Sequence, residues 1–346
     1  MKFIVVVILS FLLFPSVLLA EEAEPEKDAP AKPISDRDGK IITLVIENDS
    51  IGFQGDDKNY TSGVSLNYFD VSAKMPIIAY KLADYIPTFA INDSSSVFYT
   101  FGQNLYTPSD ITQSTQNPDD RPWAAHLYVA MGLVTATDDH IDEVEASVGV
   151  VGPWALGKQT QTFVHKYITT DSPTPEGWSN QLNNEPALLL AWQRRFPEYF
   201  AARGAGLSLG LEPHFGVTLG NVYTFANAGF SLRLIPEKDI WQDAPVRVRP
   251  ASPGTGFFEV PPKGWSWYLF AGMDVRAVAH NIFLDGNTFS DSHSVDKKYL
   301  VMDANAGLAL TYDQYRISYT FVYRTKEFDG QEDPSVFGAL SFGYRF

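Results

Sequence analysis

A repeat of two residues runs through the chain to its last residue and restricts the fold more than any other feature. In the C-terminal segment Leu340–Phe346, "LSFGYRF", large apolar side chains occupy every second position. The same alternation recurs in residues 207–212, 267–276 and 315–324. Successive side chains of a strand point to opposite faces, so each segment predicts a β-strand with one apolar face.

The second face of these strands decides whether the apolar face points into a core or into lipid. It carries charged and imidazole side chains on several strands: Glu212, His214, Asp274, Arg276, Arg316 and Arg324. An apolar outside around a polar inside is typical of a barrel in lipid, which must close because no backbone group can stay unpaired there. We therefore expect an all-β fold, a transmembrane antiparallel β-barrel. A secreted soluble β-sandwich is the alternative.

The alternating segments give about twelve expected strands, and an even number is typical of bacterial barrels with both ends on the periplasmic side. They lie near residues 41–53, 60–72, 96–107, 123–136, 140–152, 185–196, 205–218, 221–235, 265–281, 298–312, 314–325 and 335–346. Short helices are expected in two long connections, within 74–95 and over 156–168 of the connection 153–184. A third long connection, 236–264, is rich in Pro.

The N-terminus has the pattern of an export signal. Lys2 precedes an apolar stretch over residues 3–14, and a small residue, Ala20, ends the segment. This pattern predicts a signal peptide over residues 1–20. Residues 21–40 are charged, Pro-rich and poor in apolar side chains, which predicts a disordered exported tail ahead of a barrel over residues 41–346.

Composition and missing motifs exclude several classes of protein. The formal net charge of −15 leaves no basic stripe that could neutralise nucleic acid phosphates. The chain has no cysteine, so an exported fold of this size must be held by other means, such as a large hydrogen-bonded sheet. A Gly-x-Ser-x-Gly elbow, a phosphate loop and a Cys/His zinc spacing are all absent, so a Ser-triad esterase is not supported.

One strand end is unusually rich in oxygen ligands. The stretch at residues 47–63, "ENDSIGFQGDDKNYTSG", holds four acidic side chains, two Asn and one Thr. It fits either a solvated hairpin loop or a site for a hard cation such as Ca²⁺, which prefers carboxylate and carbonyl oxygens. The neighbours Asn48 and Asp49 cannot point the same way in an ideal strand, so a shared site needs a bulge or a strand end there.

The expected helix at 156–168 carries a polar face. Gln161 and His165 are spaced i and i+4 and therefore share one side of the helix, with Phe163 and Tyr167 on the adjacent stripe. A lone His is more often structural than catalytic. An imidazole with a reference pKa of ~6.5 can, however, take a proton from water near neutral pH, and a neighbouring amide can orient that water or an ester.

Four motifs in this order resemble the LpxR-type outer-membrane lipid A deacylases. They are "ENDSIGFQGDDKNYTSG", "YTPSDITQSTQNPDDRPWAAHLY", "GVVGPWALGKQTQTFVHKYI" and "GWSNQLNNEP". The resemblance extends from about residue 41 to the end of the chain. It implies a twelve-stranded barrel in the bacterial outer membrane that hydrolyses the 3′-linked acyloxyacyl ester of lipid A and depends on Ca²⁺. Lipid A is then the expected partner, and we expect a monomer.

The resemblance also assigns roles to individual residues. Asn48 and Asp49 match the Asn-Asp pair of the first strand, and Thr61 matches the Thr of the Tyr-Thr-x-Gly motif in the second. Gln161 and His165 match the helical Gln and the essential His. His165 is expected to be the general base, acting with Gln161, Thr61 and Asn48. Asp49 and Asn48 are expected to hold Ca²⁺, and all five side chains should converge.

Two further positions qualify the match. Asp171 falls where the family places an acidic residue, and we expect it as a third metal ligand. The loop after the third strand, "SDITQSTQNPDDR", has no Lys and only Arg121, whereas a family member used for comparison has basic residues there for the lipid A phosphates.

Two other functions fit the same sequence. One is a passive barrel, either a channel or a structural protein, which would line its lumen with the charged residues. The other is a lipid- or surface-binding barrel that keeps the family shape without activity. Catalysis on a lipid requires instead that the His helix and the Asn-Asp pair meet at the lipid-facing rim.

Overall fold

A computed structural model of the chain describes residues 39–52, 58–70, 76–77, 80–81, 91–92, 94–137, 139–169, 172–197, 199–237 and 264–346. The expected signal peptide lies outside these residues, as do residues 21–38 of the expected tail. Lys40, the last residue of that expected tail, already belongs to the first strand. Most of the expected helix within 74–95 and most of the Pro-rich connection also lie outside them.

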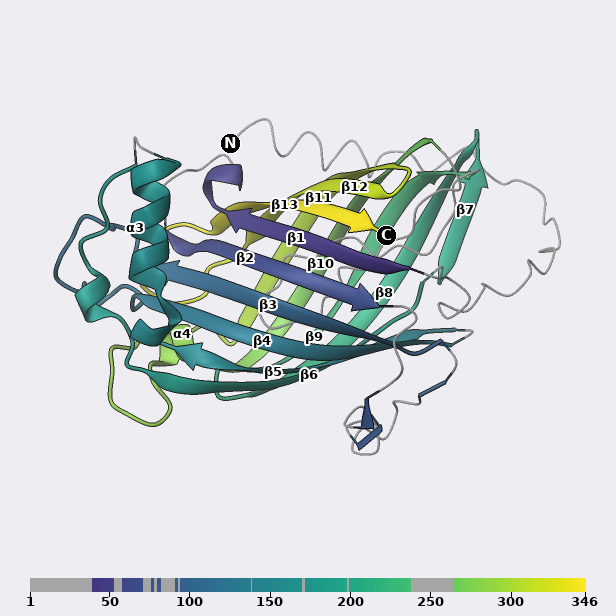
Figure 1. Cartoon of the computed structure of the whole chain (residues 1–346). Coiled ribbons are helices and arrows are strands. Elements are labelled where there is room, and N and C mark those ends of the chain that lie inside the picture. Colours follow the sequence, from purple (N-terminus) through teal and green to yellow (C-terminus); the bar gives the residue numbers. More distant parts are fainter. Residues whose placement is uncertain are drawn as a thin grey trace. The chain divides into compact units, whose positions relative to one another are not determined.

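The described residues form a closed antiparallel barrel of twelve strands with one extra strand (Figure 1). The strands are β1 (Lys40–Asn48), β2 (Asn59–Asp70), β3 (Ser96–Thr107), β4 (Ala124–Ala136), β5 (Ile141–Val151), β6 (Glu185–Arg195), β7 (Phe200–Gly204), β8 (Leu207–Gly220), β9 (Tyr223–Pro236), β10 (Trp265–Asn281), β11 (Leu300–Tyr312), β12 (Tyr315–Arg324) and β13 (Ser335–Arg345). Pairing of β6 with β8 closes the barrel, and β1 pairs with β13. The extra strand β7, which the sequence did not predict, pairs with β8.

The barrel has two distinct ends. The terminal end is where β1 begins and β13 ends. The opposite end, called the α3 end here, carries the helices α3 (Gly157–Tyr167) and α4 (Ile282–Asp285) and the 3-10 turns η2 (Ser50–Gly52), η3 (Pro153–Ala155) and η4 (Trp178–Asn180). No helix in the described part of the chain has the length and apolar character of a membrane span.

The burial of alternate side chains confirms the expected sorting between outside and lumen. Along β10, Met273 and Val275 are exposed, whereas Asp274 and Arg276 are buried. Along β12 the same holds for exposed Tyr323 and its neighbour, buried Arg324. The apolar face therefore points outward and the charged face inward, which is the arrangement required of a barrel surrounded by lipid.

Ion pairs fill the lumen between the strands. The Asp303 carboxylate accepts hydrogen bonds from Arg276 at 2.9 Å and from Arg324 at 2.8 and 2.9 Å. The Asp274 carboxylate lies 2.8 Å from the His214 ring and 2.9 Å from the Asn227 amide. Charges buried this deeply are tolerated only when they are paired, so these contacts fix the register of β8–β12.

An aromatic cluster fills the lumen near the α3 end. Phe283 of α4 stacks on Tyr106 with 3.9 Å between ring centroids, and it lies 5.4 Å from the Tyr223 ring. The hydroxyl groups of Tyr106 and Tyr223 are 2.8 Å apart, and all three side chains are buried. Together with the ion pairs, this cluster occupies space that a channel would leave to water.

We predict that Asp303→Asn strongly destabilises the barrel. It leaves the buried guanidinium groups of Arg276 and Arg324 without their shared carboxylate. Arg324 keeps Glu327 at 3.7 Å, so the cost of about 3–5 kcal/mol for an uncompensated buried charge arises at Arg276. The loss of stability is measured by thermal unfolding in detergent, because folded and unfolded barrels differ in their mobility on a gel. Asp291→Asn, in an exposed loop, is the control. Equal stability of the two variants would contradict the role given to Asp303.

Candidate functional site

The helix α3 is held against the barrel end by a short connection after β5. The chain turns at Gly152, forms η3, and enters α3 at Gly157. The Gln103 side-chain amide of β3 donates a hydrogen bond to the Ala155 carbonyl oxygen over 2.6 Å. The backbone N–H of Gly152 donates to the Ala125 carbonyl oxygen of β4 at 3.1 Å. These contacts fix the start of the helix beside the end of β3 and the beginning of β4.

The two faces of α3 are reversed relative to a helix on a soluble protein. Its buried residues are Gly157, Gln161 and His165, so the polar side chains face the protein. Phe163 and Tyr167 are 56% and 61% exposed, with their rings 5.1 Å apart. An apolar outer face with a polar inner face suits a helix that lies in the membrane interface beside a polar site.

Trp178 packs against the first residue of α3. A Cβ at Gly157 would come within 2.5 Å of both the Trp178 ring and the Ala125 side chain, so only glycine allows this approach. Trp178 is itself buried and packs 5.1 Å from the Trp123 ring. The helix therefore begins on a rigid apolar platform, which fixes the position of the turns that follow.

The same Trp fixes the orientation of Gln161. The Trp178 indole Nε1–H donates to Gln161 Oε1 over 2.8 Å. Gln161 is 3% exposed, and its Nε2 has no hydrogen-bond partner among the residues that the structure describes. A buried amide donor without a partner carries a free-energy cost. Gln161 is therefore preorganised to donate to an oxygen atom that enters the site.

The tautomer of His165 follows from its contact with the backbone. The ring Nδ1 lies 2.7 Å from the Pro173 carbonyl oxygen, which can only accept a hydrogen bond. In the neutral imidazole, Nδ1 therefore carries the proton and Nε2 the lone pair. This leaves His165 oriented as a base, one helical turn from the Gln161 donor.

Asn48, Asp49 and Thr61 form a second group where β1 ends and β2 begins. The Asn48 side-chain amide donates to the Thr61 carbonyl oxygen at 3.0 Å, and the Asp49 N–H donates to the same oxygen at 3.3 Å. The β2–β3 register shifts between Tyr60 and Ser62, which places Thr61 at a bulge. β1 thus ends at Asn48 and not at residue 53 as expected, which releases both neighbours from strict alternation.

The donor atoms of this group fit a hard cation in type. The Asp49 carboxylate is 3% exposed and accepts backbone N–H groups from Ser50 at 2.8 Å and Lys58 at 3.0 Å. Carboxylate oxygens are hard ligands, and the amide oxygen of Asn48 is of the same type. The Ser50 backbone N–H, at 2.9 Å, and the Ser50 hydroxyl group donate to that amide oxygen, so a cation there would replace a hydrogen bond. Within the described residues, no three His, Cys, Asp or Glu side chains gather as a metal site. Water and substrate oxygens would have to complete a Ca²⁺ shell.

The two groups lie at the same end of the barrel. In Figure 1, α3 runs along the end where β1, β3 and β5 finish and where β2 and β4 begin. The hydroxyl oxygen of Thr61 lies 2.6 Å from that of Thr107, the last residue of β3. The joint action of both groups on one substrate stays a prediction. Asp171, the expected third metal ligand, lies outside the described residues.

Some contacts were not predicted from the sequence. Arg121, the one basic residue of the loop after β3, is fully buried, 3.5 Å from Glu327 and 5.2 Å from the centre of the Tyr106 ring. It is therefore not exposed for a phosphate. Trp178 was assigned no role from the sequence. Its position in the "GWSNQLNNEP" motif is the feature that could have indicated one. Thr107 and the Pro173 carbonyl had no such signal.

Comparisons with known proteins bear on the family and on the fold. The family model described as outer membrane protein LpxR matches residues 5–346. LpxR from Salmonella typhimurium has a similar structure, with a TM-score of 0.71 at 20% identity, covering 88% of this chain and 99% of that chain. The β domain of the Bordetella autotransporter BrkA gives a TM-score of 0.40 at 9% identity, covering 88% of this chain and 98% of that chain. No curated protein matches the chain.

We predict that Gly157→Ala displaces α3 while the barrel stays folded. The added methyl group overlaps Trp178 and Ala125, and overpacking of this kind costs about 1–3 kcal/mol. Hydrogen exchange in peptides covering α3 should accelerate, with strand peptides unchanged. Lys158→Ala, at the next and exposed position, is the matched control. Unchanged protection of α3 in Gly157→Ala would show that this contact does not hold the helix.

Proposed function

Because the chain belongs to the LpxR family of outer-membrane proteins, we propose that it hydrolyses the 3′-linked acyloxyacyl ester of lipid A with Ca²⁺ as its cofactor. The observation that carries the proposal is the arrangement of Gln161 and His165 on the buried face of α3. Gln161 presents a hydrogen-bond donor that has no partner in the described part of the chain, and His165 is held in the tautomer of a base. Ester hydrolysis needs both functions in one place.

In the proposed reaction, His165 Nε2 takes a proton from a water molecule that attacks the ester carbonyl carbon. The negative charge that develops on the carbonyl oxygen accepts a hydrogen bond from Gln161 Nε2. The imidazolium then returns its proton to the sugar 3′-oxygen as the carbon–oxygen bond breaks. The products are a free acyloxyacyl acid and a 3′-hydroxyl group, so one water is consumed for each ester.

The Asp49 carboxylate and the Asn48 amide oxygen would hold Ca²⁺, and Asp171 is proposed as a further ligand. When bound, the cation polarises the ester carbonyl. Thr61 shares one hydrogen bond with Thr107, and a hydroxyl oxygen has three hydrogen-bonding positions. Thr61 can therefore also bind the attacking water or the ester.

The outer face of α3 explains how a lipid would reach this site. Phe163 and Tyr167 project away from the barrel, where they can lie among lipid chains. The termini of the barrel lie at the opposite end, and in bacterial barrels they face the periplasm. We infer that the α3 end faces the outer leaflet, and that one chain acts as a monomer because every assigned residue comes from it.

A lipid-binding barrel without hydrolytic activity is the second candidate. It is kept because the loop after β3 lacks Lys and its one basic residue, Arg121, is buried, so this loop gives no support for binding the phosphates of a lipid A substrate. A channel is disfavoured by the aromatic cluster and the ion pairs that occupy the lumen. Absence of hydrolysis with lipid A of varied phosphate and acyl pattern would favour the binding barrel.

We predict that His165→Ala lowers the rate of 3′-acyl release by ~10²–10⁴-fold, the usual contribution of a general base. Mass spectrometry of purified lipid A, incubated with the protein in detergent and Ca²⁺, measures the release. His140→Ala removes an imidazole at the terminal end and should leave the rate unchanged. Full activity in His165→Ala would exclude this residue as the base.

We predict that Asp49→Asn raises the Ca²⁺ concentration needed for half-maximal activity, because one ligand loses its charge. The assay uses chelator-buffered Ca²⁺, after folding has been checked by gel mobility. Asp110→Asn is the control, in a loop at the same end. Hydrogen bonds from the Thr112 hydroxyl and backbone N–H hold the pKa of Asp110 below its usual range, so the control also removes a charge. Activity that persists in excess chelator would rule out the Ca²⁺ requirement.

A further inference from the structure

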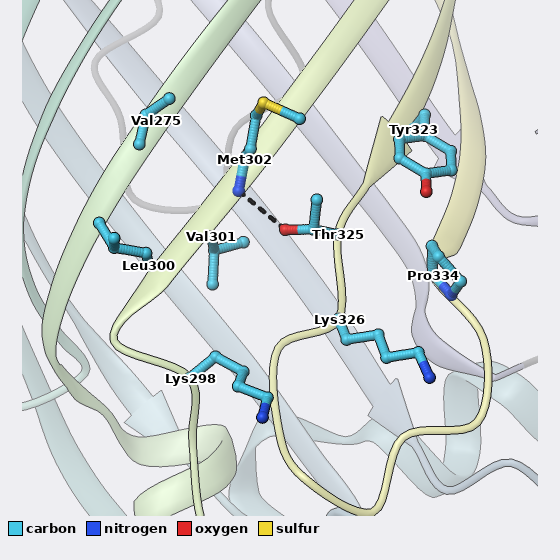
Figure 2. Close-up of a pocket in the computed structure, with 9 residues that line it drawn as sticks. All are labelled: Val275, Lys298, Leu300, Val301, Met302, Tyr323, Thr325, Lys326 and Pro334. Carbon is cyan, nitrogen blue, oxygen red and sulfur yellow. Dashed lines mark hydrogen bonds between the residues drawn. The ribbon is translucent and has the colours of Figure 1, made fainter.

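A groove lies on the outer surface of the barrel near the α3 end, away from α3 itself. It has a volume of about 420 Å³ and runs between the beginning of β11 and the end of β12 (Figure 2). Its apolar lining includes Leu300, Val275 and Tyr323, which are 68%, 42% and 39% exposed. These side chains belong to the outward face of the sheet, so the groove opens toward lipid and not toward the lumen.

Two lysines lie at the loop end of the groove. Figure 2 shows Lys298 and Lys326 toward the loops, with Val275, Met302 and Tyr323 further along the strands. Within the described chain, the lining contains these two cations and no acidic residue, although the formal net charge of the protein is −15. The lining itself is therefore cationic, whereas the connection between Lys326 and Pro334 carries the exposed acids Asp329, Glu332 and Asp333.

The two ammonium groups are available to a ligand. Lys298 pairs with Asp329, and both side chains of that pair are largely exposed, at 44% and 64%. Exposed ion pairs are weak, so an anion can compete for Lys298. Lys326 is exposed and has no ion-pair partner in the described part of the chain.

The backbone around the groove is held in place before any ligand binds. The Met302 N–H donates to the Thr325 hydroxyl at 2.9 Å, and the Thr325 N–H donates to the Met302 carbonyl at 2.9 Å (Figure 2 marks the first). The Lys298 N–H donates to the Glu327 carbonyl at 2.7 Å. Both lysines thus project from segments tied to one another, and a preformed site loses less entropy on binding.

A turn separates this groove from the candidate active site. The η2 residue Ile51 packs over Gly338 of β13, where a Cβ would come within 2.7 Å of it. The Ile51 carbonyl accepts a hydrogen bond from the Tyr319 hydroxyl of β12 at 2.9 Å. Since η2 follows Asn48 and Asp49 directly, it stands between those residues and the strands that form the groove.

We propose that the groove binds a second lipid A molecule, one that is not the substrate, with a phosphate between Lys298 and Lys326 and an acyl chain along Leu300 and Met302. Lysines at the loop end, with aliphatic and aromatic side chains further along the strands, match a phosphorylated lipid standing in the outer leaflet. Lipid A is the occupant because the α3 end faces that leaflet in the orientation inferred above. The binding itself does not require hydrolysis.

Native mass spectrometry of the full protein in detergent tests the proposal. The protein carries His165→Ala and is kept in chelator, so that turnover does not alter the lipid, and bisphosphorylated lipid A is added. We expect up to two retained lipid A molecules. Lys298→Gln with Lys326→Gln should retain one fewer, with affinity at the lost site reduced about tenfold or more by the loss of two phosphate attractions.

Controls separate the groove from general effects of charge. Lys40→Gln with Arg203→Gln removes two positive charges at the terminal end and should leave both lipids bound. Equal loss in this control, or an unchanged count in the groove variant, would overturn the proposal. Equal retention of dephosphorylated lipid A or phosphatidylglycerol at this site would overturn the choice of occupant.

Kinetics on the variant with His165 intact distinguish this site from the active site. The Lys298→Gln, Lys326→Gln protein should release 3′-acyl groups with an unchanged KM, whereas a raised KM would assign the groove to the substrate and overturn a second site. If the wild-type protein releases no acyl groups at all, the proposed hydrolysis fails. The lipid count in His165→Ala still decides whether the groove binds lipid A.

Discussion

Closure of the backbone hydrogen-bond ladder is the constraint on which the rest of this structure depends. In lipid, an unpaired strand edge has no water to satisfy it, so β6 must meet β8 and β1 must meet β13. Once the sheet is closed, each strand can place side chains only outward or into the lumen. A site that binds a lipid head group and a water molecule at the same time can then form only at the strand ends and in the connections between strands.

The strands were largely predictable because lipid imposes a strict two-residue pattern on them. The expected bounds 96–107 and 265–281 agree with β3 and β10. The pattern failed where the two faces of a strand are not divided between lipid and lumen. β7 (Phe200–Gly204) is exposed at every residue and has no alternation to detect. β1 ends early because the Asp49 carboxylate binds the N–H groups of Ser50 and Lys58, which turns the chain out of the strand.

The candidate site was only half predictable for a related reason. Helical spacing alone placed Gln161 and His165 on one face, and the structure buries that face. Their orientation depends on Trp178 and on the Pro173 carbonyl, which are contacts between a helix and a loop that no periodicity encodes. The placement of Arg121 also depends on contacts that the sequence does not encode. Its side chain turns inward to Glu327 and the Tyr106 ring, which its position in a polar loop does not indicate.

The packing of Ile51 on Gly338 has a consequence for the order of assembly. Ile51 lies in the turn that follows the first strand and Gly338 lies in the last strand, so this contact forms only after the whole chain is present and the seam between β1 and β13 has closed. Until then the turn that follows Asn48 and Asp49 has no surface to rest on. In a partly inserted chain this turn is therefore not held in place. The final geometry of Asn48 and Asp49 forms only when the barrel is complete.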